Sequence, residues 1–182
     1  VAAVGRGQAI CATKAFLCRA MARLAYDEGM RLDVATGGEL HIVLAAGVPA
    51  DACVLHGNNK SSDELRHAID AGVGRIVVDS FDEMNRLDAL HAAGAGPTPG
   101  VLLRITPGVH AHTHEFIATG QDDSKFGFNL GNGDAMRAVE RAHESASMRL
   151  VGLHCHIGSN VFEASSFGKA AEVMAAFAVP LD

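Results

Sequence analysis

A repeated strand–loop–helix unit constrains the fold of this chain more than any other feature. Short apolar runs rich in β-forming residues occur at residues 8–13, 30–34, 52–55, 75–79, 100–105 and 149–155. The stretches between them carry apolar residues three and four positions apart, as an amphipathic helix requires. Helices that separate short apolar strands predict a parallel sheet joined by right-handed crossovers. The sequence therefore predicts an α/β fold.

Signals at the predicted helix ends support this unit. Two helices begin with a capping box, Ser61 with Glu64 and Ser80 with Glu83. Three helices end in a glycine followed by an apolar residue, at Gly29, Gly47 and Gly72. Such glycines adopt the left-handed conformation that terminates a helix, so each helix is predicted to stop there.

Polar residues at the strand ends favour a barrel over a doubly wound open sheet. They are Lys14, Asp33, His56, Asp79, Arg104, His154 and His156. From Lys14 to Arg104 the steps are 19, 23, 23 and 25 residues, about one βα unit each. In a (β/α)8 barrel the functional side chains project from the C-terminal ends of several strands. No G-x-G-x-x-G motif follows the first strand, which disfavours a dinucleotide-binding sheet.

The number of units predicts a truncated barrel. About six βα units are present, whereas a closed barrel needs about eight. We therefore expect residues 1–182 to form a single, partial barrel domain, with further sequence missing on both sides. Because an unclosed barrel exposes sheet edges, the chain expressed alone is expected to be inactive and poorly soluble.

Composition limits the kinds of partner that the protein can bind and the cellular compartment in which it is expected. Asp and Glu number 21 against 15 Lys and Arg, which gives a net charge of −6 and argues against nucleic-acid or anionic-membrane partners. No apolar run reaches the ~18–20 residues of a membrane span. The four cysteines contain no C-x-x-C pair and are interpreted as reduced, mostly buried thiols of a cytoplasmic protein, at Cys11, Cys18, Cys53 and Cys155.

Two cationic residues at strand ends suggest a site. Lys14 at the end of an apolar strand would be partly desolvated, which favours a neutral amine able to attack an aldehyde. The alternative is a lysine that ends the strand with its ammonium in water. Arg104 lies within an otherwise apolar strand, so it requires a cavity, a buried anion, or an ion pair with Asp33 or Asp79.

The run His154-Cys155-His156-Ile157-Gly158-Ser159 allows two kinds of site. Alternation along a strand places His154 and His156 on one face, and the Gly158–Ser159 turn offers N–H groups and a hydroxyl. That combination suits an aromatic ring held beside a phosphate. An H-x-H pair can also chelate a metal, and a second histidine-rich run lies at residues 110–115. The metal interpretation is disfavoured, because H-x-H follows five βα units and residues 110–115 lie in a long insertion.

Several motifs together resemble a known family. They are ATKAF at residues 12–16, HGNNKS at 56–61, LRITPGV at 103–109, HTHEFI at 112–117, KFG at 125–127 and HCHIGS at 154–159. They resemble the N-terminal barrel of diaminopimelate decarboxylases, which are pyridoxal-phosphate enzymes of fold type III related to ornithine and arginine decarboxylases. The resemblance covers roughly residues 8–178. It implies an alanine-racemase-type barrel, with a C-terminal β-domain that this sequence lacks.

The resemblance also implies roles for individual residues. Lys14 would be the catalytic residue that bonds covalently to pyridoxal 5'-phosphate, and His156 would stack on the cofactor ring. Gly158 and Ser159 would lie near its phosphate. The remaining implied cofactor-site residues are Asp33, Arg104, Asn58 and Asn59.

The implied activity is decarboxylation of meso-2,6-diaminopimelate to L-lysine and CO2, the last step of lysine biosynthesis, by a homodimeric enzyme. The alternatives are a related ornithine, arginine or carboxylated-polyamine decarboxylase, a non-catalytic pyridoxal-phosphate barrel and a metal-dependent hydrolase. Two departures from the family stand out. Cys11 replaces an aromatic residue, and the family's glycine-rich phosphate loop and E-P-G-R motif are absent from this sequence.

Overall fold

The computed structural model of the chain describes residues 7–108, 126–159 and 161–181. These residues form seven strands: β1 (Ile10–Ala12), β2 (Arg31–Val34), β3 (Cys53–Leu55), β4 (Arg75–Val78), β5 (Gly100–Thr106), β6 (Phe128–Asn129) and β7 (Arg149–His154). They also form six α-helices: α1 (Arg19–Asp27), α2 (Gly37–Ala45), α3 (Ser62–Ala71), α4 (Phe81–Ala92), α5 (Asp134–Glu144) and α6 (Ala164–Ala178). Short 3-10 helices lie at η2 (Thr13–Ala15), η3 (Ala50–Ala52) and η4 (Val179–Leu181).

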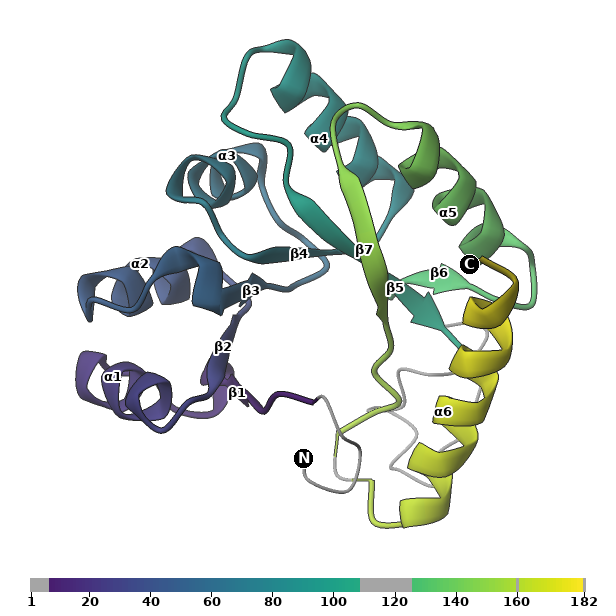
Figure 1. Cartoon of the computed structure of the whole chain (residues 1–182), viewed down its shortest axis with the longest axis horizontal. Helices are drawn as coiled ribbons and strands as arrows, with labels where there is room; N and C mark the ends of the chain where they lie inside the picture. Colours follow the sequence, from purple (N-terminus) through teal and green to yellow (C-terminus); the bar gives the residue numbers. More distant parts are fainter. Residues whose placement is uncertain (1–6, 109–125, 160, 182) are drawn as a thin grey trace.

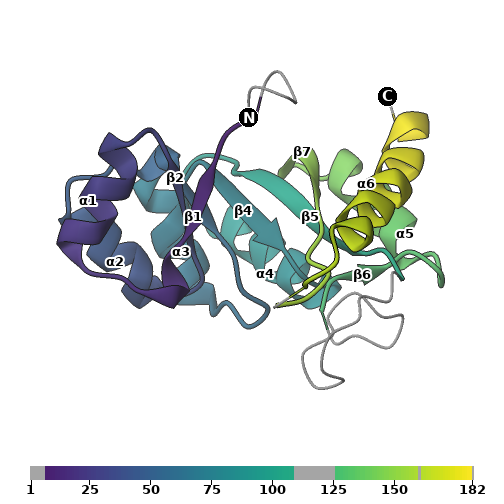
Figure 2. The same ribbon diagram turned by 90° about the horizontal axis from the view of Figure 1, so that it is seen from below.

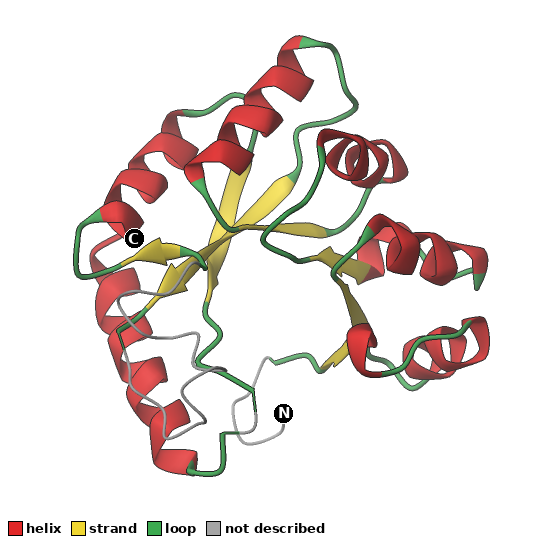
Figure 3. Ribbon diagram, turned by 180° about the vertical axis from the view of Figure 1, so that it is seen from behind, coloured by secondary structure: helices red, strands yellow, loops and turns green. Residues whose placement is uncertain are grey.

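The strands form one parallel sheet that curves into an open arc (Figure 1). Its order is β1-β2-β3-β4-β5-β6, and β7 also pairs with β5. Helices surround the outer side of the strands (Figure 3). Within the described residues β1 pairs with β2 alone and β7 with β5 alone, so the sheet does not close. In two views β1 and α6 lie apart, at the two ends of the arc (Figures 1 and 2).

The predicted fold class is confirmed, and the arrangement is that of a partial barrel. All six predicted runs contain a strand, while β6 was not predicted because two residues carry no periodicity. The core lies between the sheet and the helices, where it includes the fully buried side chains of Leu32, Leu40, Leu55, Leu65, Ile76, Leu87 and Leu103. Burying each such side chain contributes about 1.5–3 kcal/mol. Among the described residues, no helix is long and apolar enough to span a membrane.

The predicted helix starts are confirmed at α3 and modified at α4. Ser61 and Glu64 form a complete capping box, with Ser61 N 2.9 Å from Glu64 Oε2 and Glu64 N 3.2 Å from Ser61 Oγ. Ser80 Oγ accepts a hydrogen bond from Glu83 N at 3.2 Å. The Glu83 carboxylate, however, accepts from Asp79 N at 3.0 Å. The same carboxylate also pairs with the buried Lys60, which is described below.

Candidate functional site

A cavity of about 290 Å3 lies at the C-terminal ends of the strands. Its lining comes from η2 and from the ends of β2, β3, β5 and β7, and consists of Lys14, Ala35, His56, Gly57, Asn58, Arg104, Phe126, His156 and Ser159. The structure therefore brings five of the eight predicted site residues together. Asp33 lines an adjacent cavity, and Gly158 lines a third one on the α6 side of β7. Asn59 belongs to the loop after β3, where it is exposed and does not line the cavity.

Lys14 lies on η2, directly after β1. Thr13 fixes this turn, because its buried hydroxyl donates a hydrogen bond to Asp33 O at 2.8 Å. Lys14 is exposed, and β1 is exposed too, with 49% of the Ile10 surface accessible. The prediction of a desolvated lysine at a buried strand end is therefore wrong for this structure, because β1 has a described neighbour on one side alone. The side chain nevertheless lines the cavity.

Arg104 pairs with Asp79 rather than with Asp33. Arg104 Nη1 lies 2.8 Å from Asp79 Oδ2, and both side chains are buried. The other carboxylate oxygen of Asp79 accepts a hydrogen bond from Gly127 N at 2.8 Å. The Arg104 guanidinium also lies over the Phe126 ring, 4.6 Å from its centroid. The cavity wall formed by Arg104 and Phe126 is thus held by a paired charge and a cation–π contact.

Asp33, His56 and His154 line a second cavity of about 180 Å3 inside the arc of strands. His56 Nδ1 lies 3.4 Å from Asp33 Oδ2, and the His56 and His154 rings meet edge to face with centroids 4.6 Å apart. Because His56 lines both cavities, it joins them. Three buried atoms in this group lack a hydrogen-bond partner among the described residues: Asp33 Oδ1, His56 Nε2 and His154 Nδ1.

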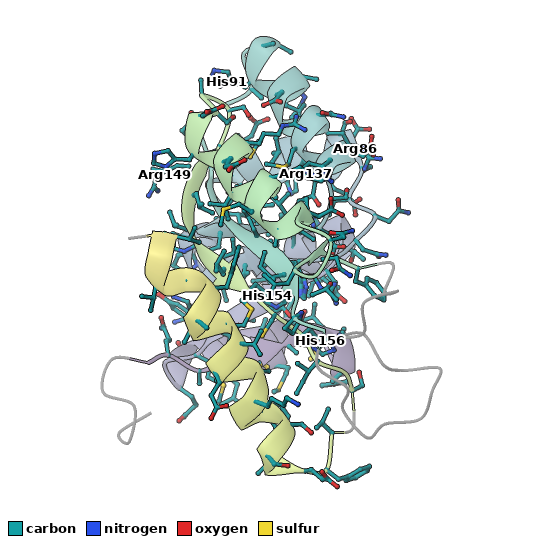
Figure 4. All side chains as sticks on the ribbon, turned by 90° about the vertical axis from the view of Figure 1, so that its right-hand side faces the viewer. Arg86, His91, Arg137, Arg149, His154 and His156 are labelled. Carbon is teal, nitrogen blue, oxygen red and sulfur yellow. The ribbon has the colours of Figure 1, made fainter. Side chains whose placement is uncertain are left out.

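The two predicted imidazoles of the H-x-H motif have different surroundings. His154 is the last residue of β7, and His156 follows on the segment that leaves this strand (Figure 4). Burial, then the charges of His56 and Arg104, lowers the pKa of His154 to about 3. Burial, then the charges of Arg104 and Lys14, also lowers the pKa of His156. His154 is therefore an uncharged ring of the inner cavity, while His156 faces the Lys14 cavity.

The described residues contain no group of three or more His, Cys, Asp and Glu side chains arranged to hold a metal ion. The histidine-rich run at 110–115, on which the metal interpretation partly depended, lies outside the described residues.

Sequence reasoning gave no cofactor-site role to five residues of the site region, which are Ala35, His56, Gly57, Phe126 and Lys60. Gly57 and Phe126 line the cavity but have no reactive group, so only their motifs marked them. Lys60 is buried behind the cavity wall, where its Nζ lies 2.9 Å from Glu83 Oε1. In the sequence Lys60 belongs to a polar loop, and such a lysine is ordinarily exposed.

The fold and site define this chain as part of an α/β-barrel protein with its site at the carboxyl ends of parallel strands. A family model described as "Pyridoxal-dependent decarboxylase, pyridoxal binding domain" matches residues 1–181, and the chain belongs to this family.

Curated relatives are similar over most of this chain. It is 52% identical to a diaminopimelate decarboxylase of Bacillus subtilis over 167 residues, which cover 92% of this chain and 38% of the relative. It is 53% identical to that of Mycobacterium tuberculosis over 171 residues, which cover 93% of this chain and 38% of the relative. The chain thus spans about two fifths of the length of these relatives.

Solved structures share the fold. One is a diaminopimelate decarboxylase mutant from Helicobacter pylori complexed with L-lysine. It has a TM-score of 0.89 and 28% identity, with 97% of this chain and 44% of that chain covered. The enzyme from M. jannaschii in co-complex with L-lysine has a TM-score of 0.86 and 35% identity, with 97% of this chain and 41% of that chain covered.

The cavity lining fits pyridoxal phosphate by the chemistry of its groups. Lys14 provides a primary amine for the aldehyde, His156 a flat ring, and Ser159 and Asn58 hydrogen-bond donors. His56 Nε2 is buried and has no hydrogen-bond partner among the described residues. This nitrogen is therefore available to form a hydrogen bond with a bound group.

Proposed function

We propose that this chain is the cofactor-binding part of a pyridoxal-phosphate-dependent decarboxylase that converts meso-diaminopimelate to L-lysine and CO2. One observation carries the proposal: Lys14 shares a single cavity with His156, Ser159 and Arg104. The choice of substrate is supported by relatives named diaminopimelate decarboxylase at 52–53% identity. It is also supported by related structures complexed with L-lysine, which is the product of the proposed reaction.

The proposal gives the residues of the cavity distinct tasks. Lys14 would bind the cofactor aldehyde through Nζ, and His156 would lie against the ring. Gly158 and Ser159 would contribute donors toward the phosphate. The Arg104–Asp79 pair and Asp33 would hold the surrounding polar groups in place. Asn58 and Asn59 would complete the site from the loop after β3.

Bound pyridoxal phosphate supplies an electron sink for the carbanion that remains when CO2 leaves. In the proposal, Lys14 is the residue of this chain that transfers a proton during the reaction. Its Nζ would hold a proton within the cavity and could donate or accept it there. Burial and the charge of Arg104 lower the pKa of His156, which favours the uncharged ring beside the cofactor.

We further propose that the complete enzyme is a cytoplasmic homodimer without nucleic-acid or membrane partners. The acidic composition argues against nucleic-acid and anionic-membrane partners, and the cysteine pattern supports the compartment. The homodimer is what the family resemblance implies. Substrate recognition would then require segments outside this chain, which spans 38% of its curated relatives.

A chimeric enzyme tests the proposed function. Residues 1–182 would replace the matching segment of the Bacillus subtilis enzyme, alongside Lys14→Ala and, as a matched control, Lys169→Ala on the exposed side of α6. We expect a yellow protein that releases CO2 and L-lysine from meso-diaminopimelate but not CO2 from ornithine. Borohydride reduction followed by peptide mass spectrometry should locate the cofactor on Lys14. Colourless protein, or unchanged turnover by Lys14→Ala, would refute the assignment.

A further inference from the structure

Lys60 is a buried lysine with no direct place in the cavity. Its side chain is 1% exposed, and its Nζ contacts three oxygens: Val77 O at 2.8 Å, Glu83 Oε1 at 2.9 Å, and Gly57 O. Two of these contacts, to the carbonyl oxygens of Val77 and Gly57, are hydrogen bonds, and the contact with Glu83 is an ion pair. Lys60 itself does not line the Lys14 cavity.

The three contacts fasten the loop that follows β3. Gly57 O is held by the Lys60 ammonium, and Lys60 O accepts a hydrogen bond from Arg86 Nη1 at 2.5 Å. These two attachments lie on either side of Asn58, which lines the Lys14 cavity with His56 and Gly57. The loop backbone is thus fixed at both ends of the segment that faces the cavity.

Lys60 also belongs to a buried charge cluster, which we define as Lys60, Glu83, Asp79 and Arg104. Glu83 Oε2 accepts from Asp79 N at 3.0 Å, and Asp79 Oδ2 pairs with Arg104 Nη1 at 2.8 Å. The residue exposures are 2%, 3%, 3% and 6%, so all four groups are desolvated. Two cations balance two anions. Because an uncompensated buried charge is costly, the four side chains are expected to hold one arrangement.

We propose that Lys60 is a positioning residue of the Lys14 cavity. It fixes the loop at residues 56–59 through Gly57 O, and it supports Arg104 through Glu83 and Asp79. The effect on the cofactor rests on the proposed function, whereas the effect on the loop does not.

The rival explanation is that Lys60 stabilises the fold without ordering the cavity. Lys60→Met with Glu83→Gln separates the two roles. This pair removes one buried cation and one buried anion, so the remaining Asp79–Arg104 pair stays balanced, and replacing a buried ion pair as a whole is often close to neutral for stability. The glutamine can still accept from Asp79 N. What the double variant loses is the ammonium that holds Gly57 O in the loop and Val77 O on β4.

The test combines two measurements: amide hydrogen exchange without the cofactor, and the affinity for the cofactor. Amide hydrogen exchange of the peptide covering residues 56–61 is followed in the chimera without cofactor, with Lys169→Met as the matched surface control. Loss of a charge-assisted hydrogen bond predicts exchange roughly ten- to a hundredfold faster there in Lys60→Met/Glu83→Gln, with the core helices little changed. In the chimera, the dissociation constant for pyridoxal phosphate is expected to rise by a similar factor.

Each outcome decides the proposal. Unchanged exchange at 56–61 would overturn it, and so would faster exchange in a chimera that binds the cofactor as tightly as before. If the chimera with wild-type residues binds no cofactor while exchange still rises, the proposed function fails and the positioning of the loop stands. Should the double variant not fold, Lys60→Leu/Glu83→Gln, which likewise leaves no donor for Gly57 O at position 60, gives the same comparison.

Discussion

Arg104 Nη1 lies 2.8 Å from Asp79 Oδ2, and this contact explains how an apolar strand accommodates a guanidinium. Both side chains are buried. Asp79 uses its second oxygen to accept from Gly127 N at 2.8 Å. Asp79 therefore joins the end of β4 to the strand β5 and to the segment before β6, and Arg104 and Phe126 from the last two line the Lys14 cavity.

Removing one partner of this pair should destabilise the chain strongly. Asp79→Asn leaves the Arg104 charge buried and unpaired, so we expect the free energy of unfolding to fall by about 3–5 kcal/mol. Urea denaturation followed by circular dichroism measures it. The control is Asp27→Asn, whose partner Arg23 is about half exposed, and which should change stability far less because water screens an exposed pair. Similar losses in the two variants would contradict the assignment of a buried pair.

Gly57 should tolerate a methyl group less well than Gly29. Both have positive φ, 108° at Gly57 and 82° at Gly29, so alanine brings roughly 1–2 kcal/mol of backbone strain at either position. At Gly57 the new Cβ would also lie 2.8 Å from Ala35 O, while at Gly29 it meets nothing within 4 Å. Gly57→Ala is therefore expected to be the more destabilising in urea denaturation and to weaken cofactor binding in the chimera. Equal effects of the two substitutions would show that the loop can move away from Ala35.

The sequence predicted which residues share the cavity more accurately than it predicted which side chains are buried or exposed. Lys14, Arg104 and His156 share a cavity because parallel strands end at one edge of a sheet, and their spacing already indicated strand ends. The exposure of Lys14 depends on the neighbours of β1, which local pattern does not specify. The burial of Lys60 depends on contacts 17 residues away, at Val77, and further along the chain at Glu83. Periodicity carries no information on such contacts.

His154 should make the chain less stable as the pH falls. Its pKa is about 3 in the folded chain, because of burial and the charges of His56, Arg104 and His156, with Asp33 opposing them. The unfolded chain has the ordinary value of about 6.5 and so takes up a proton that the folded chain does not. Stability is thus lost as the pH drops from about 6.5 toward 3. Between pH 7 and pH 5 this group alone should cost roughly 2 kcal/mol.

Urea denaturation of the wild type and of His154→Asn at several pH values checks this. The wild-type free energy of unfolding should decline more steeply between pH 7 and 5, because asparagine does not titrate. The histidines other than His56 and His156, which interact electrostatically with His154, contribute equally to both curves. Parallel curves would show that His154 is protonated in the folded chain or is not buried.

The four cysteines should react with iodoacetamide in an order set by their environments. Cys18 is exposed, Cys11 and Cys155 are partly buried, and Cys53 is buried, so the prediction of mostly buried thiols is wrong. Burial, and secondarily the charge of Asp51, raises the pKa of Cys53 to about 11, and burial also raises that of Cys155. Because the thiolate is the reactive species, Cys18 should be alkylated at pH 8 on the order of a hundredfold faster than Cys53, even before steric protection adds to the difference. Peptide mass spectrometry at successive times measures this ratio. In urea all four rates should converge, and rapid labelling of Cys53 in the folded chain would mean that β3 is not enclosed by its neighbouring strands and helices.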